Sequence, residues 1–316
     1  MKKYISSFLF LAAAMLWGFA FTAQKESEAL SAFAIGAVRS FIATLFLFAM
    51  IPLLDKAFKN GRRLISKEKW LDINRTELIG GAVCGAILTV ATAFQQTGLN
   101  TGTDAGKAAF ITALYVLIVP IVSLLFGKRS PINVWISVGI AVVGFYLLCV
   151  KDDLTVLPSD ALVLICAFIF SFHIIAIDHF SPKCDGVRMS CVQFFVAFVL
   201  NTICSLIFDG APNFPQIAEN LPTLAYLGVC SSGIAYTLQI IGQRDANPAV
   251  ASIILSLESV FGVVGGAMFL GEAMSPREYI GCAIVFLAVI LSQLDISSHK
   301  KRSSGKSESS DQCEIG

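Results

Sequence analysis

The chain has 316 residues, 56% of them hydrophobic and only 14% charged, with a formal net charge of +1. A soluble domain usually carries about 25% charged residues, so this composition argues against a water-soluble fold. The chain has no basic face, which excludes the electrostatic pattern of a nucleic-acid-binding protein.

Ten apolar stretches are each close to the roughly 20 residues that the hydrocarbon core of a bilayer requires. The first, 4–23, follows two lysines and imitates a secretory signal peptide, but its length and the spans after it favour a retained helix. The other nine predicted spans are 32–54, 78–98, 104–126, 131–150, 159–178, 188–208, 221–241, 248–270 and 276–294. The predicted fold class is therefore an all-α integral membrane protein with ten transmembrane helices.

The distribution of basic residues predicts the orientation of these spans. With a cytoplasmic N-terminus, 18 of the 23 Lys and Arg residues fall in inside segments, and Arg39 alone lies deep within a span. This bias is what the positive-inside rule expects, so we predict a multi-pass plasma-membrane protein with both termini in the cytoplasm. The longest inside segment, 55–77, contains Trp70 and is interpreted as a solvated basic loop or as an amphipathic stretch on the inner leaflet.

The two halves of the chain contain similar segments. Residues 105–150 resemble residues 248–293 at an offset of 143, which becomes 144 after a one-residue slip, and this offset pairs Leu114 with Leu257. Each segment is a long helix, a turn with a small residue, Gly and a charge, then Pro and a Gly-containing helix. Two apolar helices align easily by chance, but the shared order of these features argues against coincidence.

Five spans in each half, an odd number, would give the halves opposite orientations in the membrane. The predicted domains are therefore two inverted five-helix repeats, 1–150 and 151–295. The remaining residues, 296–316, are rich in Ser, Lys and Glu and are predicted to form a disordered cytoplasmic tail.

The order of several short motifs resembles one known family, the EamA-type members of the drug/metabolite transporter superfamily. The residues that carry the resemblance are Trp17-Gly18 with Phe21, Arg39, Ala108-Ala109-Phe110-Ile111 through Pro120, Leu257-Glu258 with Phe261, and Leu270-Gly271-Glu272. The resemblance covers about residues 5–295 and implies export of small metabolites such as amino acids, or of drug-like compounds. The chain departs from the family pattern at Ser259, where Pro is usual, and at Gly127-Lys128, where Gly-Glu is usual.

Two charged residues within the predicted spans are the main candidates for a substrate pathway. Glu258 lies near the centre of its span, where a charged side chain costs roughly 2.5–3.5 kcal/mol. It must be paired, protonated or in contact with water, so it could line a cavity and couple to protons, or bond a neighbouring helix. Arg39 could be the counter-ion of an anionic substrate group or of Glu258, or could extend outward to the interface.

Uncharged polar and aromatic residues at membrane depth complete the set of candidates. They are Trp17, Gln95, Gln96, Tyr115, His173, Asn201, Tyr236 and Gln239. A His can change protonation near neutral pH, although a lone His on an apolar helix is also a common packing residue. Gln96 and Gln239 occupy equivalent helices of the two repeats. Such residues bind substrate or bond across helices.

Small residues and one proline mark sites of close helix packing or of bending. Gly81 and Gly85 form a GxxxG pair, Gly262, Gly265 and Gly266 lie in the ninth span, and Pro120 should kink the fourth. These residues suit bending during transport, and static packing would explain the glycines equally well.

The cysteines are interpreted as packing residues. None of the nine forms a CxxC pair, and most lie inside apolar stretches, so no metal, cofactor or disulfide is expected. Cys184 and Cys313 lie outside the spans, and we expect impermeant thiol reagents to label them only from the cytoplasm.

The pattern as a whole favours a secondary transporter, and the resemblance implies that it exports a small metabolite. The lipid bilayer is the other expected partner. Proton coupling is left open. No GxxxxGK[ST] loop is present, so transport would not be driven by nucleotide hydrolysis on this chain. The alternatives are a membrane sensor or assembly protein without transport and an intramembrane enzyme, for which the sequence provides no convincing catalytic pair.

Overall fold

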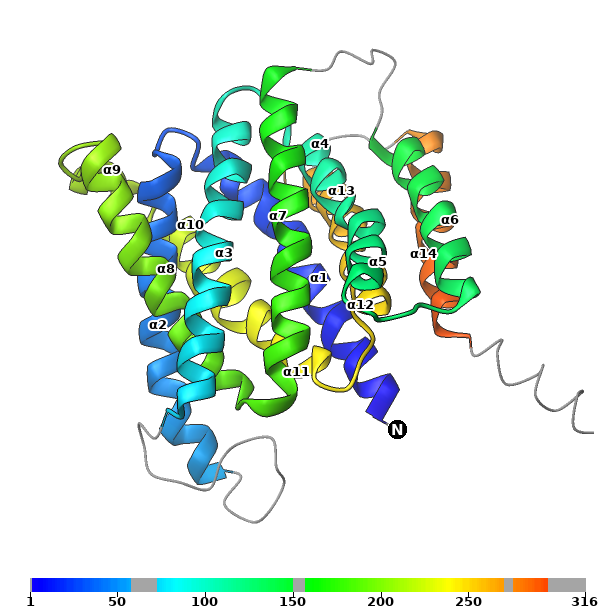
Figure 1. Cartoon of the computed structure of the whole chain (residues 1–316). Helices are drawn as coiled ribbons and strands as arrows, with labels where there is room; N and C mark the ends of the chain where they lie inside the picture. The colour runs from blue at the N-terminus through cyan, green and yellow to red at the C-terminus, as the bar shows by residue number, and fades with distance from the viewer. Residues whose placement is uncertain (1, 58–72, 150–156, 270–274, 295–316) are drawn as a thin grey trace, which may run out of the picture.

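The structure, a computed structural model, describes residues 2–57, 73–149, 157–269 and 275–294. Every regular element within these ranges is helical, and most helices run side by side (Figure 1). The prediction of an all-α fold is confirmed for this part of the chain. The loop around Trp70, the boundary near residue 150 and the tail 296–316 lie wholly or partly outside the described residues.

The helices follow the predicted spans closely. Those of the first half are α1 (Lys2–Glu26), α2 (Ala32–Ala57), α3 (Arg75–Asn100), α4 (Ala105–Ala113), α5 (Tyr115–Leu125) and α6 (Ile132–Cys149). Those of the second half are α7 (Pro158–Phe180), the short 3₁₀ turn η1 (Ser181–Lys183), α8 (Gly186–Phe208), α9 (Phe214–Glu219), α10 (Leu221–Tyr226), the π-helical segment η2 (Leu227–Ala235), α11 (Tyr236–Gln243), α12 (Pro248–Leu255), α13 (Glu258–Phe269) and α14 (Pro276–Gln293).

Eight helical stretches of the described chain are long and apolar enough to cross a membrane. They are Tyr4–Glu26, Ala32–Leu54, Arg75–Asn100, Ala105–Leu125, Pro158–Lys183, Gly186–Phe208, Leu221–Gln243 and Pro248–Met268. The two remaining predicted spans, 131–150 and 276–294, correspond to α6 and α14, which pack against each other and whose apolar parts are shorter. A helix satisfies its own backbone hydrogen bonds, which is why apolar stretches of this length become helices in lipid.

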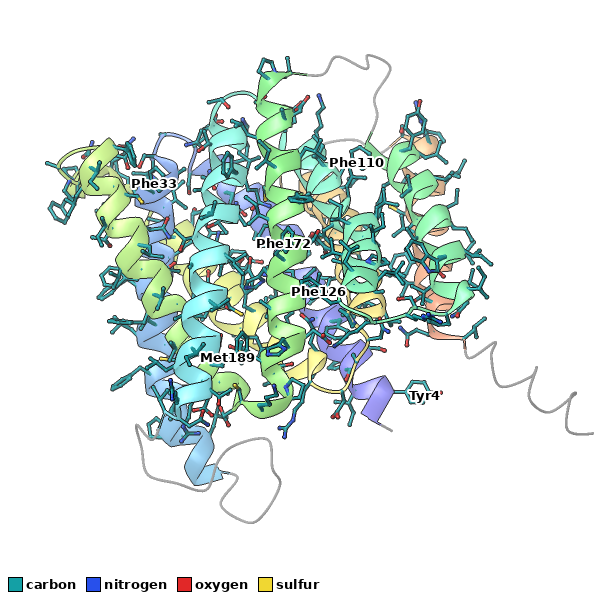
Figure 2. The ribbon with its side chains drawn as sticks, viewed as in Figure 1. Tyr4, Phe33, Phe110, Phe126, Phe172 and Met189 are labelled. Carbon is teal, nitrogen blue, oxygen red and sulfur yellow. The ribbon has the colours of Figure 1, made fainter. Side chains whose placement is uncertain are left out.

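The outer surface carries large apolar side chains along most helices. Tyr4, for example, projects from the surface and is 79% exposed, and Phe126 and Phe172 are also exposed (Figure 2). A soluble monomer rarely exposes large continuous apolar areas. A bilayer is the solvent that such a surface fits, in agreement with a multi-pass membrane protein.

Helix α1 lies at the centre of the helix packing. It contacts α3 and α4 of the first half and α10, η2, α11, α12 and α13 of the second half. Around it, α2 packs against α8, and α3 packs against both α7 and α8. The interior between α1 and these helices contains the site described below.

Two of the predicted spans are interrupted at equivalent points. The span that begins at Ala105 breaks at Leu114, and the span that begins at Pro248 breaks at Ser256 and Leu257. At both breaks the chain tightens to bonds between residues three apart, from Leu114 N to Ile111 O and from Leu257 N to Ile254 O. The sequence offset of 143 pairs Leu114 with Leu257, but the expected kink at Pro120 does not mark the interruption, which lies six residues earlier.

Glycines allow close helix contacts at the predicted positions. A Cβ at Gly85 would lie 2.5 Å from Gln193 O, and one at Gly81 would lie 2.6 Å from Val192 Cβ, so α3 and α8 need both glycines to approach. On α13, Gly262, Gly265 and Gly266 are buried, and a Cβ at Gly265 would lie 2.9 Å from a carbon of the Phe19 ring.

Candidate functional site

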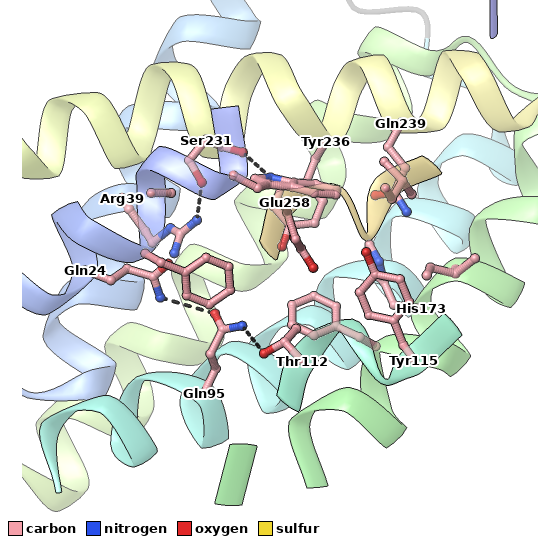
Figure 3. A pocket seen from close by; sticks show the side chains of 16 residues that line it. Gln24, Arg39, Gln95, Thr112, Tyr115, His173, Ser231, Tyr236, Gln239 and Glu258 are labelled. Carbon is pink, nitrogen blue, oxygen red and sulfur yellow. Dashed lines mark hydrogen bonds between the residues drawn. The ribbon is translucent and has the colours of Figure 1, made fainter. Parts of the chain in front are cut away.

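A buried pocket lies where helices of both halves meet around α1. Its cavity volume is about 30 Å³, and its lining comes from α1–α5, α7, η2 and α11–α13 (Figure 3). Eight of the ten predicted pathway residues line it: Trp17, Arg39, Gln95, Tyr115, His173, Tyr236, Gln239 and Glu258. The other two, Gln96 and Asn201, are buried but lie outside the lining.

Arg39 is held by neutral hydroxyl groups. Its Nε donates to Ser232 Oγ at 2.9 Å and its Nη2 donates to Ser231 Oγ at 3.1 Å, and the residue is only 6% exposed. No ion pair between Arg39 and a carboxylate is present within the described residues, so a direct Arg39–Glu258 pair is not observed. The positive charge therefore remains available to an anionic group in the pocket.

The π-helical segment η2 positions Ser231 and Ser232 to accept the hydrogen bonds from Arg39. Its wider turn presents two consecutive serines to α2, and the Ser231 carbonyl accepts a hydrogen bond from Trp17 Nε1 at 3.0 Å. Ser231 thus joins α1, α2 and η2 through one residue. The sequence analysis missed these serines, since serine is a common packing residue in membrane helices.

Glu258 is the first residue of α13, directly after the interruption. Its side chain is buried, and Oε1 has no hydrogen-bond partner within the described residues. The Tyr115 hydroxyl is in the same situation and faces the Glu258 carboxyl group across the pocket (Figure 3). Tyr115 is the first residue of α5, so each interrupted span places one polar side chain at the corresponding point of the pocket.

A chain of side-chain amides forms another part of the lining. Gln24 Nε2 donates to Gln95 Oε1 at 3.2 Å and to Gln96 Oε1 at 3.1 Å, and Gln95 Nε2 donates to Thr112 Oγ1 at 3.1 Å. Gln96 therefore supports the lining from behind, where it also donates to Asn100 Oδ1 at 2.8 Å. These groups join α1, α3 and α4 and offer the pocket neutral donors and acceptors.

Gln24 and Thr112 are lining residues that the sequence analysis missed. Gln24 lies one residue beyond the predicted span 4–23, because the apolar run ends there while α1 continues to Glu26. The pair of glutamines in α3 was the signal that could have led to Gln24, since buried amides need partners. Thr112 gave no signal of its own within an apolar helix.

Aromatic rings form the remaining wall. The ring of Tyr236 lies 4.6 Å from that of Trp17 and 5.7 Å from that of His173, measured between centroids. His173 Nε2 lies 3.1 Å from Gln193 Oε1, and His173 Nδ1 is buried without a partner within the described residues. The ring is therefore fully buried and has one ring nitrogen without a hydrogen bond in this part of the chain.

Gln239 and Asn201 differ in their relation to the pocket. Gln239 Nε2 donates to Gln243 Oε1 at 2.9 Å, and its own Oε1 is buried without a partner within the described residues. Asn201 Nδ2 donates to Ala197 O in its own helix at 2.8 Å, and its side chain packs against Gly36. The structure thus places Asn201 in helix packing, whereas Gln239 offers an acceptor in the pocket.

Comparisons with known proteins agree with this architecture. A model of the EamA-like transporter family matches residues 5–150 and 157–294. A protein of Archaeoglobus fulgidus described as an uncharacterized transporter is 29% identical over 289 residues, which cover 90% of this chain and 84% of that protein. The uncharacterized inner membrane transporter YedA of Escherichia coli K12 is 25% identical over 248 residues, 78% of each chain.

The fold itself also occurs in a solved structure. One crystal structure superposes with a TM-score of 0.72 at 16% sequence identity, covering 91% of this chain and 96% of the other. At this identity the likeness shows a shared fold and nothing about substrate.

Proposed function

Because the chain belongs to the EamA-like transporter family, we propose that it is a secondary transporter that exports a small polar or zwitterionic metabolite through the central pocket. The observation that carries this proposal is that two separate, buried ionisable groups, Arg39 and Glu258, line the pocket together with neutral amides. Burying a charge without a counter-charge is costly, so a protein keeps such groups where a ligand completes them. A solute with one carboxylate and one ammonium group would do so.

We further propose ten membrane spans in two inverted repeats, with both termini in the cytoplasm of a cell whose plasma membrane holds the protein. Helices α6 and α14 would supply the two spans beyond the eight long ones. The interruptions at Leu114 and Leu257, together with the two separate family matches, support the repeat. Interrupted helices at a repeat interface are a common construction for transport sites.

Glu258 is the group that we propose exchanges a proton during transport. Among the described residues that line the pocket it is the only carboxylate, and the Tyr115 hydroxyl faces it. Binding of an ammonium group would favour the ionised carboxylate, whereas an empty buried site would favour the neutral acid. If Glu258→Gln transports as well as the wild type, Glu258 has no part in proton coupling.

The first experiment compares solutes that accumulate in the medium. Wild type, Glu258→Ala and Arg39→Ala are expressed at matched membrane levels, with Glu28→Gln as the control because Glu28 is exposed and lies outside the pocket. We expect at least one polar solute that wild type and Glu28→Gln enrich and that both pocket variants fail to enrich. If no solute differs, uptake into liposomes containing purified protein separates an importer from a membrane protein without transport activity. If wild type and all variants move the same solutes equally, the pocket is not the pathway.

A further inference from the structure

Helix α7 carries an aspartate near each of its ends, on the same side. Asp160 and Asp178 are 18 residues apart, which is five turns of an α-helix and about 27 Å along its axis. Each aspartate is paired with a lysine from the interrupted α4–α5 unit or the turn that follows it. The seam between α7 and α4–α5 therefore has one ion pair at each end.

The first pair joins α4 to the beginning of α7. Lys107 Nζ lies 2.5 Å from Asp160 Oδ2, and the Asp160 side chain is only 5% exposed. Two further bonds orient this carboxylate, from Thr103 Oγ1 to Oδ1 at 3.0 Å and from Leu157 N to Oδ2 at 2.7 Å. Asp160 is thus fixed in the first turn of α7.

The second pair joins the end of α5 to the end of α7. Lys128 Nζ pairs with Asp178 Oδ2, and the lysine side chain is half exposed whereas that of Asp178 is 9% exposed. The turn that brings Lys128 back is made by Gly127, whose φ of +77° favours glycine. Lys128 stands at the position where the family pattern described above has an acidic residue.

The pocket lies between the two pairs along the seam. Thr112 and Tyr115 line it from α4–α5, and Phe170 and Ile174 line it from α7. By contrast, the pairs Lys25–Glu28 and Arg188–Asp185 join residues three apart in the sequence and link no two spans. The break at Leu114 separates α4, which carries Lys107, from α5, which leads to Lys128, so the two lysines belong to separate half-helices.

We propose that Lys107–Asp160 and Lys128–Asp178 are the two gates of the central pocket, the first toward the outside and the second toward the cytoplasm. The inference rests on the proposed function, since a gate requires a pathway. Alternating access needs the pocket to open to one side while it stays closed to the other, and two separate pairs on one seam meet that need. Partly exposed ion pairs suit the task because each is weak enough to break and re-form.

The test measures access to a cysteine in the pocket from each side of the membrane. Thr112→Cys, a near-isosteric change, is labelled with an impermeant maleimide in intact cells and in inside-out vesicles, and its peptide is quantified by mass spectrometry. The gate variants are Lys107→Gln and Lys128→Gln, which leave both aspartates in place and keep the bond from Leu157 N to Asp160. Lys107→Arg and Lys128→Arg keep the charge, and Glu28→Gln is the matched control outside the seam.

The expected effects are opposite for the two gates. Lys107→Gln should raise labelling from the outside about fivefold and leave labelling from the inside unchanged, and Lys128→Gln should do the reverse. The Arg variants and Glu28→Gln should label at the wild-type rate. Asp178→Asn removes the same attraction from the other partner and replaces Lys128→Gln if that variant fails to accumulate.

Two results would overturn the inference. The first leaves the proposed pocket pathway intact, and the second refutes it as well. If position 112 is labelled in the wild type but no Gln variant changes the labelling, or both change it from the same side, the pairs are static links and the pocket pathway stands. If position 112 is never labelled from either side in any variant, the pathway of the proposed function fails and the gates fail with it.

Discussion

The hydrogen bonds from Arg39 to Ser231 and Ser232 predict a measurable coupling between α2 and η2. Replacing both serines by alanine leaves the buried guanidinium without the two acceptors at 2.9 and 3.1 Å. Hydrogen bonds to charged groups contribute about 1.5–3 kcal/mol in soluble proteins, but side-chain bonds between membrane helices average only about 0.6 kcal/mol, with a maximum near 1.7. Two charge-assisted bonds at full burial should reach the upper part of the membrane range, so we expect about 2 kcal/mol of coupling.

A double-mutant cycle isolates this quantity. The free energy of unfolding in mixed detergent micelles is measured for wild type, Ser231→Ala/Ser232→Ala, Arg39→Met and the triple variant. The serine changes should cost about 2 kcal/mol more in the wild-type background, where Arg39 is present, than in the Arg39→Met background. Ser256→Ala is the control, because within the described residues the Ser256 hydroxyl donates only to Ile253 O, three residues earlier in the chain. An equal cost of the serine changes in both backgrounds would refute the view that η2 positions Arg39.

Three further changes test other contacts. Gly85→Ala should destabilise the protein by about 1–3 kcal/mol because its Cβ would meet the backbone at Gln193, whereas Gly139→Ala, with open space around it, should be neutral in the same unfolding assay. Ser259→Ala should cost about 0.6 kcal/mol through loss of the 2.9 Å bond to Ala109 O, and a neutral result would show that this bond does not hold α13 to α4. The pKa of the Cys184 thiol is raised to about 11, mainly by burial and also by the nearby Glu77 and Asp185 carboxylates. The rate of its alkylation, measured by peptide mass spectrometry, should therefore rise about tenfold per pH unit from pH 8 to pH 10. A rate that levels off near pH 9 would contradict this environment.

The surroundings of Cys184 in the structure also change an expectation drawn from the sequence. From its position between two spans, Cys184 is expected to be labelled by impermeant reagents only from the cytoplasm. The structure leaves it only 5% exposed, packed with Cys84, Ile177, Met189 and Ile240, so at neutral pH it should react slowly from either side. The position of a residue between spans predicts its side of the membrane and not its exposure. The corresponding expectation for Cys313 concerns a residue outside the described part of the chain.

The sequence predicted the helices well because one physical property determines them. A run of about 20 apolar residues has no alternative to a helix in lipid, so the predicted spans and the observed helices agree closely. The same reasoning cannot find a break inside an apolar run. Leu114 has no neighbouring Gly or Pro that would mark an interruption, and Pro120, which has the expected signal, lies within α5.

The site could be predicted only in part, for a related reason. Charged residues such as Glu258 and Arg39 stand out in an apolar span, and the structure brings both into the pocket lining. Serines and threonines do not stand out, and their role depends on a partner that is distant in sequence. The role of Ser231, for example, depends on its hydrogen bond with Arg39, which lies 192 residues away in the sequence. Asn201 shows the reverse case, because a polar residue at membrane depth bonds its own helix instead of lining the pocket.

The packing of the interrupted spans suggests how the pocket and the seam could work together. Helix α4 packs against α13, and α5 packs against α12, so the half-helices of the two interrupted spans pair crosswise (Figure 1). The Ser259 hydroxyl links α13 to α4 through Ala109 O, in place of the proline that the family usually has. Both breaks, and with them Tyr115 and Glu258, lie where one pair of half-helices meets the other. A movement of α4 with α13, or of α5 with α12, against the continuous α7 would open one ion pair and leave the other closed. Tyr115 and Glu258 would then lie in the part of the pocket that both movements share, where we propose that Glu258 exchanges its proton.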